Sequence, residues 1–443
     1  MNWLAYHLPL AKRTHLVYKL NIKKYIETKM AMRTHKFRLY PNKEAEMKML
    51  NALELCRQTY NELLGLLNEQ KEIDKAQIQG IIPDMKICDK RYKQLYSKTM
   101  QYECYRLFSN LSALRETKKK NRKVGSLRFK GKGWFKTFTY NQSGFKLINT
   151  GKRHQILKLS KIGDIPIRCH RKIKGKIKQV TIKREASGKW FAFIAIESSA
   201  FGVPKQRVLS TEQTEKEIMP LQKVEKVVGI DVGLDNFVYD SEGKFIKNPR
   251  HLNKYKEQLA KLQRQLSKTK KRSENRNKQR IKVARVYEKI TNVRNDFLHK
   301  LSNYYVNNYD AIGMEDMPMG LKGNIFAKSK QDASWGKFRQ FIAYKAESAG
   351  KLFVPVSYRG TTQRCSQCSE IVHKELWDRE HKCGCGFIAP RDYNSALEIK
   401  RLCLKKIGLE QPESTPVEMG AILPLLVATS VSESGSHNLN TRC

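Results

Sequence analysis

Acidic side chains are scarce in this sequence. Its 443 residues include 42 Asp and Glu but 86 Lys and Arg, which gives a formal net charge of +44. Self-repulsion on this scale is hard to explain for a protein that works alone, so we expect a polyanionic partner, of which nucleic acid is the commonest. Hydrophobic residues make up 40% of the chain. This content excludes a wholly disordered chain, and the length suits two to four folded domains.

Long apolar runs, internal repeats and evenly spaced cysteines are missing too. No stretch approaches 18 uninterrupted apolar residues, which excludes a membrane-spanning helix. The first ten residues lack the length and flanks of a signal sequence. Of the ten cysteines six are scattered and four are clustered between residues 365 and 385. This distribution favours a cytoplasmic protein with one metal site over a disulfide scaffold.

The start of the chain has no clear helical or strand period. Residues 1–31 are basic and mixed, whereas a clean strand-like pattern follows Met32. We predict that the working protein begins near Met32; the alternative is an ordinary N-terminal extension over residues 1–31.

The N-terminal half alternates between strand and helix patterns. From residue 43 to about 116, apolar residues recur every three or four positions, which predicts packed helices broken near residues 80–84. Residues 126–197 form short alternating segments, which predict a small β-barrel, a common platform for nucleic acids. Residues 199–222 are polar and predict a linker. Some aromatic residues of the strand region belong to its core and others could stack on bases, without a sign of which: Trp134, Phe135, Phe138, Tyr140, Trp190 and Phe191.

The C-terminal half has a different order of elements. From residue 224 we predict a strand, a hairpin, a long helical insertion, a strand, a helix, a strand and a helix, which is the order of an RNase H-like fold. The insertion over residues 251–300 holds 16 Lys and Arg but 4 Asp and Glu. This imbalance favours helices that follow phosphates over an ordinary solvated pair. The candidate contacts are Arg264, Lys270, Lys271, Arg272, Arg276 and Arg280.

Three carboxylates stand at particular places in this order. Asp231 lies in the first strand, Glu315 ends a later strand and Asp392 opens the last helix. Considered one at a time, Asp231 could begin a turn, Glu315 could lie exposed at a rim and Asp392 could cap a helix. In an RNase H-like fold the three positions converge, and their repulsion requires cations. Two Mg²⁺ ions would clamp a phosphodiester, activate a water and stabilise the leaving oxygen. We expect Asp235, on the opposite strand face, to play no part.

The clustered cysteines have the spacing of a zinc site. Cys365 and Cys368 form C-x2-C, and fourteen residues later Cys383 and Cys385 form C-x-C. Four thiolates favour tetrahedral zinc, and such a closed site is structural. The second pair has one intervening residue where two are usual, although the glycines at 384 and 386 make the tight turn feasible. His381 or His373 could substitute as a ligand if the geometry fails.

Several sequence blocks together resemble a known family. "HKFRLYPNKEAE", "VVGIDVGLDN", "GMEDMP", "TTQRCSQC" and "CGCGFIAPRDYNSALEI" occur in the order seen in TnpB (OrfB) proteins, over roughly residues 32–404. These are RNA-guided nucleases of small bacterial and archaeal transposons, related to the type V CRISPR effectors. The family often has Asp where this chain has Pro390, but the expected ligand is the second acid, Asp392.

The resemblance implies a multidomain α+β architecture. Its RuvC-like, RNase H-type nuclease domain would contain Asp231, Glu315 and Asp392 as metal ligands and an inserted zinc finger. An N-terminal wedge β-barrel would be interrupted by a helical recognition domain. The implied ranges are 32–42 and 126–205 for the barrel, 43–125 for the recognition domain, 224–404 for the nuclease domain, 251–308 for its basic insertion, 361–388 for the zinc finger and 405–443 for a flexible tail.

The resemblance also implies a function and partners. A guide RNA from the transposon end would pair with target double-stranded DNA beside a short adjacent motif, and the RuvC-like site would cut the DNA in the bacterial or archaeal cytoplasm, at the nucleoid. One alternative is a nuclease-inactive, RNA-guided DNA-binding repressor, against which the three intact acids argue. The other is a transposase that acts directly on transposon ends.

Overall fold

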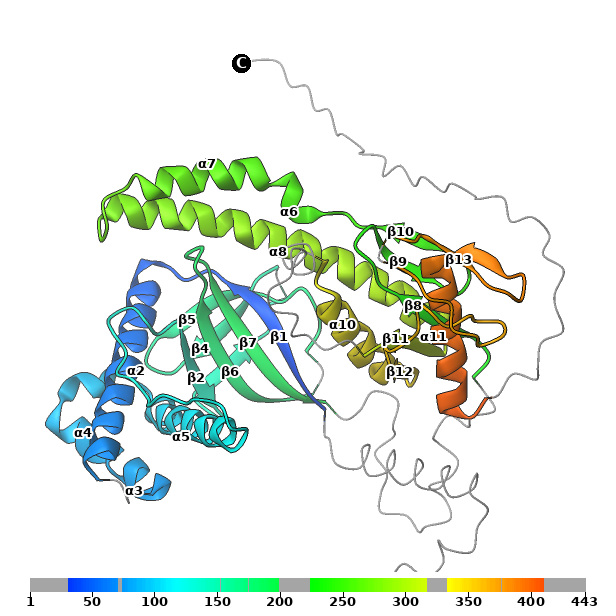
Figure 1. Ribbon diagram of the computed structural model, residues 1–443. Coiled ribbons are helices and arrows are strands. Elements are labelled where there is room, and N and C mark those ends of the chain that lie inside the picture. The colour runs from blue at the N-terminus through cyan, green and yellow to red at the C-terminus, as the bar shows by residue number, and fades with distance from the viewer. Residues whose placement is uncertain are drawn as a thin grey trace, which may run out of the picture.

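Two sheets, each with its own helices, make up most of the molecule (Figure 1). The N-terminal extension, the predicted linker and most of the predicted tail lie outside the described residues. Within the part that is described, no helix is long and apolar enough to cross a membrane. The computed structural model describes residues 31–70, 74–151, 153–173, 175–198, 224–316, 333–375 and 377–409.

The first sheet has seven antiparallel strands in the order β2-β6-β7-β1-β5-β4-β3. Its ends approach one another, since the Tyr140 hydroxyl on β2 donates to the Ser160 carbonyl beyond β4 at 2.7 Å. The predicted strands are confirmed, but β3 was missed because it is short and lacks a fully buried side chain. Closure into a barrel stays a prediction. The strands are β1 (Ala31–Leu39), β2 (Thr137–Asn141), β3 (Phe145–Ile148), β4 (Gln155–Leu159), β5 (Gly163–Arg168), β6 (Lys176–Arg184) and β7 (Trp190–Ser198).

The N-terminal helices pack on this sheet. The long helix α2 is capped by Asn42, whose side chain accepts from the Ala45 N–H at 2.8 Å. Helices and sheet share one cluster of buried apolar residues, so they form a single packed unit. The basic run at 117–123 was predicted as a loop, but its first residues still belong to α5. The elements are α2 (Lys43–Glu69), α3 (Lys75–Gly80), α4 (Ile82–Cys88), the 3₁₀ turn η1 (Lys90–Gln94) and α5 (Ser97–Lys119).

The second sheet has five strands in the order β10-β9-β8-β11-β12. The first three strands are antiparallel, including the predicted hairpin, whereas β8, β11 and β12 run parallel. Helices α8 and α10 cover one face and α11 covers the other, each over its own apolar cluster. The elements are β8 (Val227–Asp231), β9 (Asn236–Asp240), β10 (Phe245–Lys247), β11 (Ala311–Glu315), α10 (Trp335–Ser348), β12 (Leu352–Val356) and α11 (Arg391–Ile407).

The predicted basic insertion is helical. The short α6 (His251–Lys254) leads into α7 (Lys256–Ser267), which folds back on the long α8 (Glu274–Asn308). The beginning of α8 packs on α7, and its end packs on the five-stranded sheet. Figure 1 shows this hairpin extending over the seven-stranded sheet. An ion pair of 3.1 Å between Lys189 and Glu288 joins the two there.

Glycines let α11 lie directly on the strands beneath it. A Cβ atom at Gly229 on β8 would lie 2.1 Å from the Ala396 carbonyl oxygen and 2.4 Å from the Lys400 amide nitrogen. A Cβ atom at Gly313 on β11 would lie 2.9 Å from the Cys403 Cβ. Because the first two contacts are with backbone, a side chain at 229 would force the helix away from the sheet.

We therefore expect Gly229→Ala to lower the free energy of unfolding by about 3 kcal/mol through overpacking. Gly65→Ala in α2 is the matched control, since its new methyl group would meet nothing within 4 Å. That control should raise the stability by up to about 1 kcal/mol, because alanine favours the helix. Urea denaturation followed by circular dichroism measures both variants. Equal stability of the two would contradict the close helix–sheet contact.

Candidate active site and metal centre

Two of the predicted acids lie at the ends of neighbouring parallel strands. Asp231 is the last residue of β8 and Glu315 the last of β11. The register pairs Ile230 with Met314, so the next position along each strand brings Asp231 beside Glu315. The carboxyl ends of parallel strands meet at one edge of a sheet, which is where open α/β sheets usually place their sites.

The third acid reaches the same edge on the first turn of α11. Asp392 is the second residue of this helix, which the glycines of β8 and β11 hold against the sheet. A Cβ atom at Gly233, just beyond β8, would lie 3.9 Å from the Asp392 Oδ2. The Asp392 carboxylate therefore lies against the turn that follows β8. Three segments far apart in the sequence bring the three predicted acids together.

The electrostatics of the site show negative charge that the protein itself compensates poorly. Burial raises the pKa of Asp231 well above its usual range, and the carboxylates of Glu315 and Asp392 raise it further. Burial also raises the pKa of Glu315, against the opposing effect of a hydrogen bond from the Thr361 hydroxyl. The Arg391 guanidinium lies 3.3 Å from Asp392. Such a cluster is the environment in which a bound cation stabilises carboxylates.

Asp235, which was expected to play no part, lies apart from this cluster. Its exposed carboxylate bridges Arg250 at 3.1 Å and Arg379 at 3.0 Å. Both oxygens are thus engaged by guanidinium groups from two other segments. This geometry suits a surface tether between loops.

The four predicted cysteines converge in a small module. The two-stranded sheet of β13 (Glu380–Lys382) and β14 (Ile388–Pro390) forms part of it. The sulfur atoms of Cys365 and Cys385 lie 3.8 Å apart, and those of Cys368 and Cys383 lie 3.4 Å apart. A zinc–sulfur bond of about 2.3 Å requires roughly 3.8 Å between the sulfurs of a tetrahedral site. The four thiols therefore fit one zinc ion.

Among the described residues, the cysteines form the one group of three or more His, Cys, Asp or Glu whose ligand atoms all lie within 4.8 Å of one another. The three acids are thus more widely spread than the thiols. His381 is buried beside Phe387, and its Nδ1 faces the Lys374 amine rather than the sulfurs. His373 is exposed. Neither histidine belongs to the sulfur cluster, so the C-x-C pair needs no substitute.

Of the six candidate cations in the basic hairpin, five are exposed and one is engaged within the fold. The Arg276 guanidinium donates to the carbonyl oxygens of Leu266 and Thr269, each at 3.0 Å, and thereby ties α8 to the end of α7. This places Arg276 in the hairpin's own structure and makes it a poor candidate for a phosphate contact. The remaining candidates are on the surface: Arg264, Lys270, Lys271, Arg272 and Arg280.

The structure also separates the aromatic residues that the sequence could not. Phe135, Phe138, Tyr140 and Trp190 are core residues, each at most 6% exposed. Phe191 is half-buried, with Lys36 4.1 Å and Arg38 5.1 Å from its ring centre. Trp134 is 67% exposed. Of the six, Trp134 is therefore the one whose ring is open to a base.

Sequence reasoning missed two side chains of the acidic site. Thr361 hydrogen-bonds Glu315 from 46 residues away, and Arg391 flanks Asp392. The threonine gave no signal, because its role depends on how the loop after β12 folds back to the sheet edge. Arg391 stands within the quoted motif, but its direction becomes visible only with α11 in place.

Comparison with known protein families places parts of the chain in the OrfB group. Residues 208–322 match the OrfB family described as "Probable transposase", and residues 335–399 match a domain described as "Cas12f1-like, TNB domain". Residues 30–74 match a domain of the same OrfB group described as "Helix-turn-helix domain". The described residues of this range form one strand and one long helix.

Full-length relatives agree with this placement. The chain is 27% identical over 383 residues to a "Putative RNA-guided DNA endonuclease" of Streptomyces pristinaespiralis, covering 83% of this chain and 88% of the relative. It is 28% identical over 396 residues to the "Putative RNA-guided DNA endonuclease InsQ" of Escherichia coli K12, covering 83% and 91%. A Cas12f1 chain solved by cryo-electron microscopy with a single-guide RNA and target DNA superimposes with a TM-score of 0.51 at 13% identity, covering 84% of this chain and 98% of that one.

The mixed α+β architecture is thus of the Cas12 effector type. The chain contains the matched OrfB-group domains and is similar to proteins named as RNA-guided DNA endonucleases, in line with the resemblance to the TnpB (OrfB) family that its sequence blocks indicated.

Proposed function

We propose that this chain is a transposon-encoded, RNA-guided and Mg²⁺-dependent DNA endonuclease that cuts beside a short adjacent motif. One observation carries the proposal: Asp231, Glu315 and Asp392 converge from three segments at one sheet edge. The names of the two relatives described above support guided DNA cleavage as the reaction.

The strand order supports a RuvC-like, RNase H-type nuclease domain over residues 224–404. A hairpin of β9 and β10 extends the antiparallel side of β8, and β11 and β12 continue the sheet in parallel. On this proposal α6, α7 and α8 are its basic insertion, residues 361–388 its zinc finger, and the seven-stranded sheet a wedge-type barrel interrupted by the recognition helices 43–125.

The acids would hold two Mg²⁺ ions, because hard oxygen ligands and uncompensated negative charge suit this cation. Bound there, the ions supply activation of a water and stabilisation of the leaving oxygen of a phosphodiester. The chain's own residues fix the ligands. Thr361 orients the Glu315 carboxylate by its hydrogen bond, and Gly229 lets α11 bring Asp392 to the edge. The four cysteines would hold one structural Zn²⁺ ion.

The partners on this proposal are a guide RNA from the transposon end and target double-stranded DNA, met in the cytoplasm at the nucleoid. The charge of +44 supports a polyanionic complex. Five cations of the α7–α8 hairpin are the candidates for contacts with its phosphates: Arg264, Lys270, Lys271, Arg272 and Arg280.

The test is to sequence the RNA that co-purifies with the protein and then to offer the complex a plasmid library with randomised flanks. We expect one discrete transposon-end transcript and cleavage that requires Mg²⁺, matching guide and one flanking motif. Binding without products would favour the repressor, and strand-transfer products would favour the transposase. Bulk random RNA would leave only a basic nuclease without a guide.

A further inference from the structure

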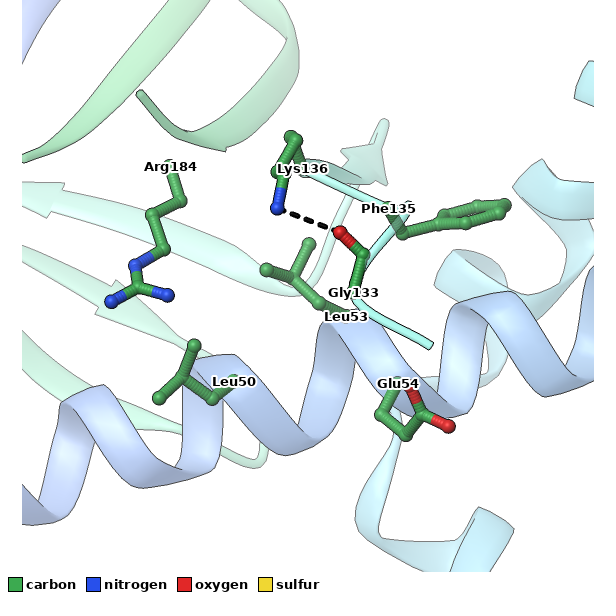
Figure 2. Close-up of a pocket in the computed structure, with 7 residues that line it drawn as sticks. All are labelled: Leu50, Leu53, Glu54, Gly133, Phe135, Lys136 and Arg184. Carbon is green, nitrogen blue, oxygen red and sulfur yellow. Dashed lines mark hydrogen bonds between the residues drawn. The ribbon is translucent and has the colours of Figure 1, made fainter. Parts of the chain in front are cut away.

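A small pocket lies far from the acidic site, between α2 and the edge of the seven-stranded sheet. Its cavity volume is about 80 Å³. Figure 2 shows Leu50 and Leu53 of α2 below, Lys136 above and the Arg184 guanidinium at one side. A site for one water needs roughly 10–15 Å³ by this kind of measure, so the pocket has room for a polyatomic group such as phosphate. Its other lining residues are Glu54, Gly133 and Phe135.

Two cations from separate elements line this pocket, and a third lies near them. Lys136 precedes β2 and Arg184 ends β6, and the backbone N–H of Arg184 donates to the Lys136 carbonyl at 2.9 Å. Their side chains therefore emerge from neighbouring positions. Arg280 of α8 lies close enough that it lowers the pKa of Lys136, after the larger effects of burial and Arg184. Such a meeting of like charges is unfavourable unless an anion compensates it.

The nearby acids compensate these cations only weakly. Glu54 accepts three hydrogen bonds from the Arg57 guanidinium, at 2.5–3.1 Å. Glu46 accepts from the Trp190 ring N–H at 3.0 Å and lies 4.0 Å from Arg184. Among the described residues, the buried Nε of Arg184 has no hydrogen-bond acceptor. Because this Nε is buried, the Arg184 guanidinium would meet an oxyanion in the hollow through its terminal nitrogens, which suit such a group.

The loop at the rim of the pocket presents an aromatic ring. Arg57 and Asn61 of α2 both donate to the Lys130 carbonyl, at 2.8 and 3.0 Å, and so fix the loop. The Lys130 amine lies 5.3 Å from the ring centre of Trp134. Trp134 stands between two lining residues yet is 67% exposed. A large exposed indole beside a cationic hollow is the combination that binds a nucleotide unit: phosphate on the cations and base on the ring.

We propose that the pocket lined by Lys136 and Arg184, with Arg280 nearby, binds one phosphodiester group of a nucleic-acid strand, and that Trp134 stacks on an adjacent unpaired base. The identity of the strand rests on the proposed function, whereas the phosphate chemistry rests on the pocket. The strand is guide RNA or target DNA, which share this chemistry, and two binding measurements distinguish them.

The variants are Arg184→Gln, Lys136→Gln, Arg280→Gln and Trp134→Ala. Lys278→Gln is the matched control, since Lys278 is an exposed cation on the same helix as Arg280. One measurement titrates the RNA-free protein with a synthetic copy of the co-purified RNA. The other titrates guide-loaded protein that carries Asp231→Ala with the target duplex. Thermal melting checks that each variant folds.

In one of the two measurements we expect Arg184→Gln to weaken binding about tenfold. Each lost cation should also reduce the salt dependence by about one counterion. Trp134→Ala should weaken binding about tenfold with an unchanged salt slope, because stacking is uncharged. Lys278→Gln should stay within about twofold of the unsubstituted protein. When single phosphates of the strand are ethylated, one position should weaken binding to the unsubstituted protein but leave binding to Arg184→Gln unchanged.

The proposal is overturned if the three cation variants match Lys278→Gln in both measurements, or if no phosphate position depends on Arg184. Failure of the proposed function would look different. An unsubstituted complex that never cuts DNA, with an RNA measurement that still depends on Arg184 and Trp134, would refute guided cleavage and leave the pocket in place.

Discussion

Replacing Asp231 with alanine should abolish DNA cleavage and leave binding of guide RNA and target nearly unchanged. Asp231 is the most central of the three acids, since both other carboxylates raise its pKa. Its removal deletes a ligand for the proposed cations but no contact with the nucleic acid itself. We expect the cleavage rate to fall by about a thousandfold or more, which corresponds to about 4 kcal/mol of transition-state stabilisation. Single-turnover cleavage at saturating protein measures it.

Asp235→Asn is the matched control for this experiment. It neutralises a carboxylate four residues away that bridges two arginines on the surface. Cleavage by this variant should remain within about twofold, because exposed ion pairs contribute little. If Asp231→Ala cuts at full rate, or if Asp235→Asn is the inactive variant, the assignment of the acidic site is wrong.

The pattern of strands was enough to predict why Asp231 and Glu315 meet. Each ends a short apolar segment, and parallel neighbours present such ends at one edge. Asp235 was set aside because we expected it on the opposite strand face, whereas it lies between β8 and β9. What the sequence could not predict depends on long-range contacts. The hydrogen bond from Thr361 to Glu315 is one case, and the meeting of Lys136 and Arg184 at one pocket is another.

Charge patterning had a similar limit. The excess of cations over residues 251–300 correctly predicted a basic helical surface, but it could not tell a surface cation from a structural one. Arg276 looks like its neighbours in sequence, yet its guanidinium caps the end of α7. Trp134 and Phe135 are adjacent and both aromatic, but one is 67% exposed and the other 6%. Local composition predicts the kind of surface, and packing decides which side chains serve it.

The cysteine module holds the start of α11, so a zinc ion bound there would be linked to the acidic site. The Ser366 N–H donates to the Asn394 side chain at 3.0 Å, and that side chain donates to the Arg364 carbonyl at 2.8 Å. The Arg391 guanidinium donates to the Asp378 carbonyl at 2.9 Å. Asp392 lies between these two attachment points. A structural zinc ion contributes folding free energy to such a module directly, so its loss should loosen the helix end that carries this acid.

We therefore expect Cys368→Ser to lose the single bound zinc ion and to slow DNA cleavage about 10–100-fold. Losses of this size are usual when a group that holds a metal ligand in place is removed, and here the ligand held in place is Asp392. Cleavage should fall less than in Asp231→Ala, because Asp392 is displaced but still present. Mass spectrometry of the metal content and single-turnover cleavage measure the two effects. Limited proteolysis should show new cuts within residues 361–390.

Cys88→Ser controls for the general effect of removing a thiol, since Cys88 is exposed and outside the module. It should keep its zinc content and full cleavage. A Cys368→Ser protein that retains one zinc ion would show that His381 or another group completes the site. A protein that loses zinc but cuts at the normal rate would instead show that the attachments through Asn394 and Arg391 position Asp392 without help from the metal.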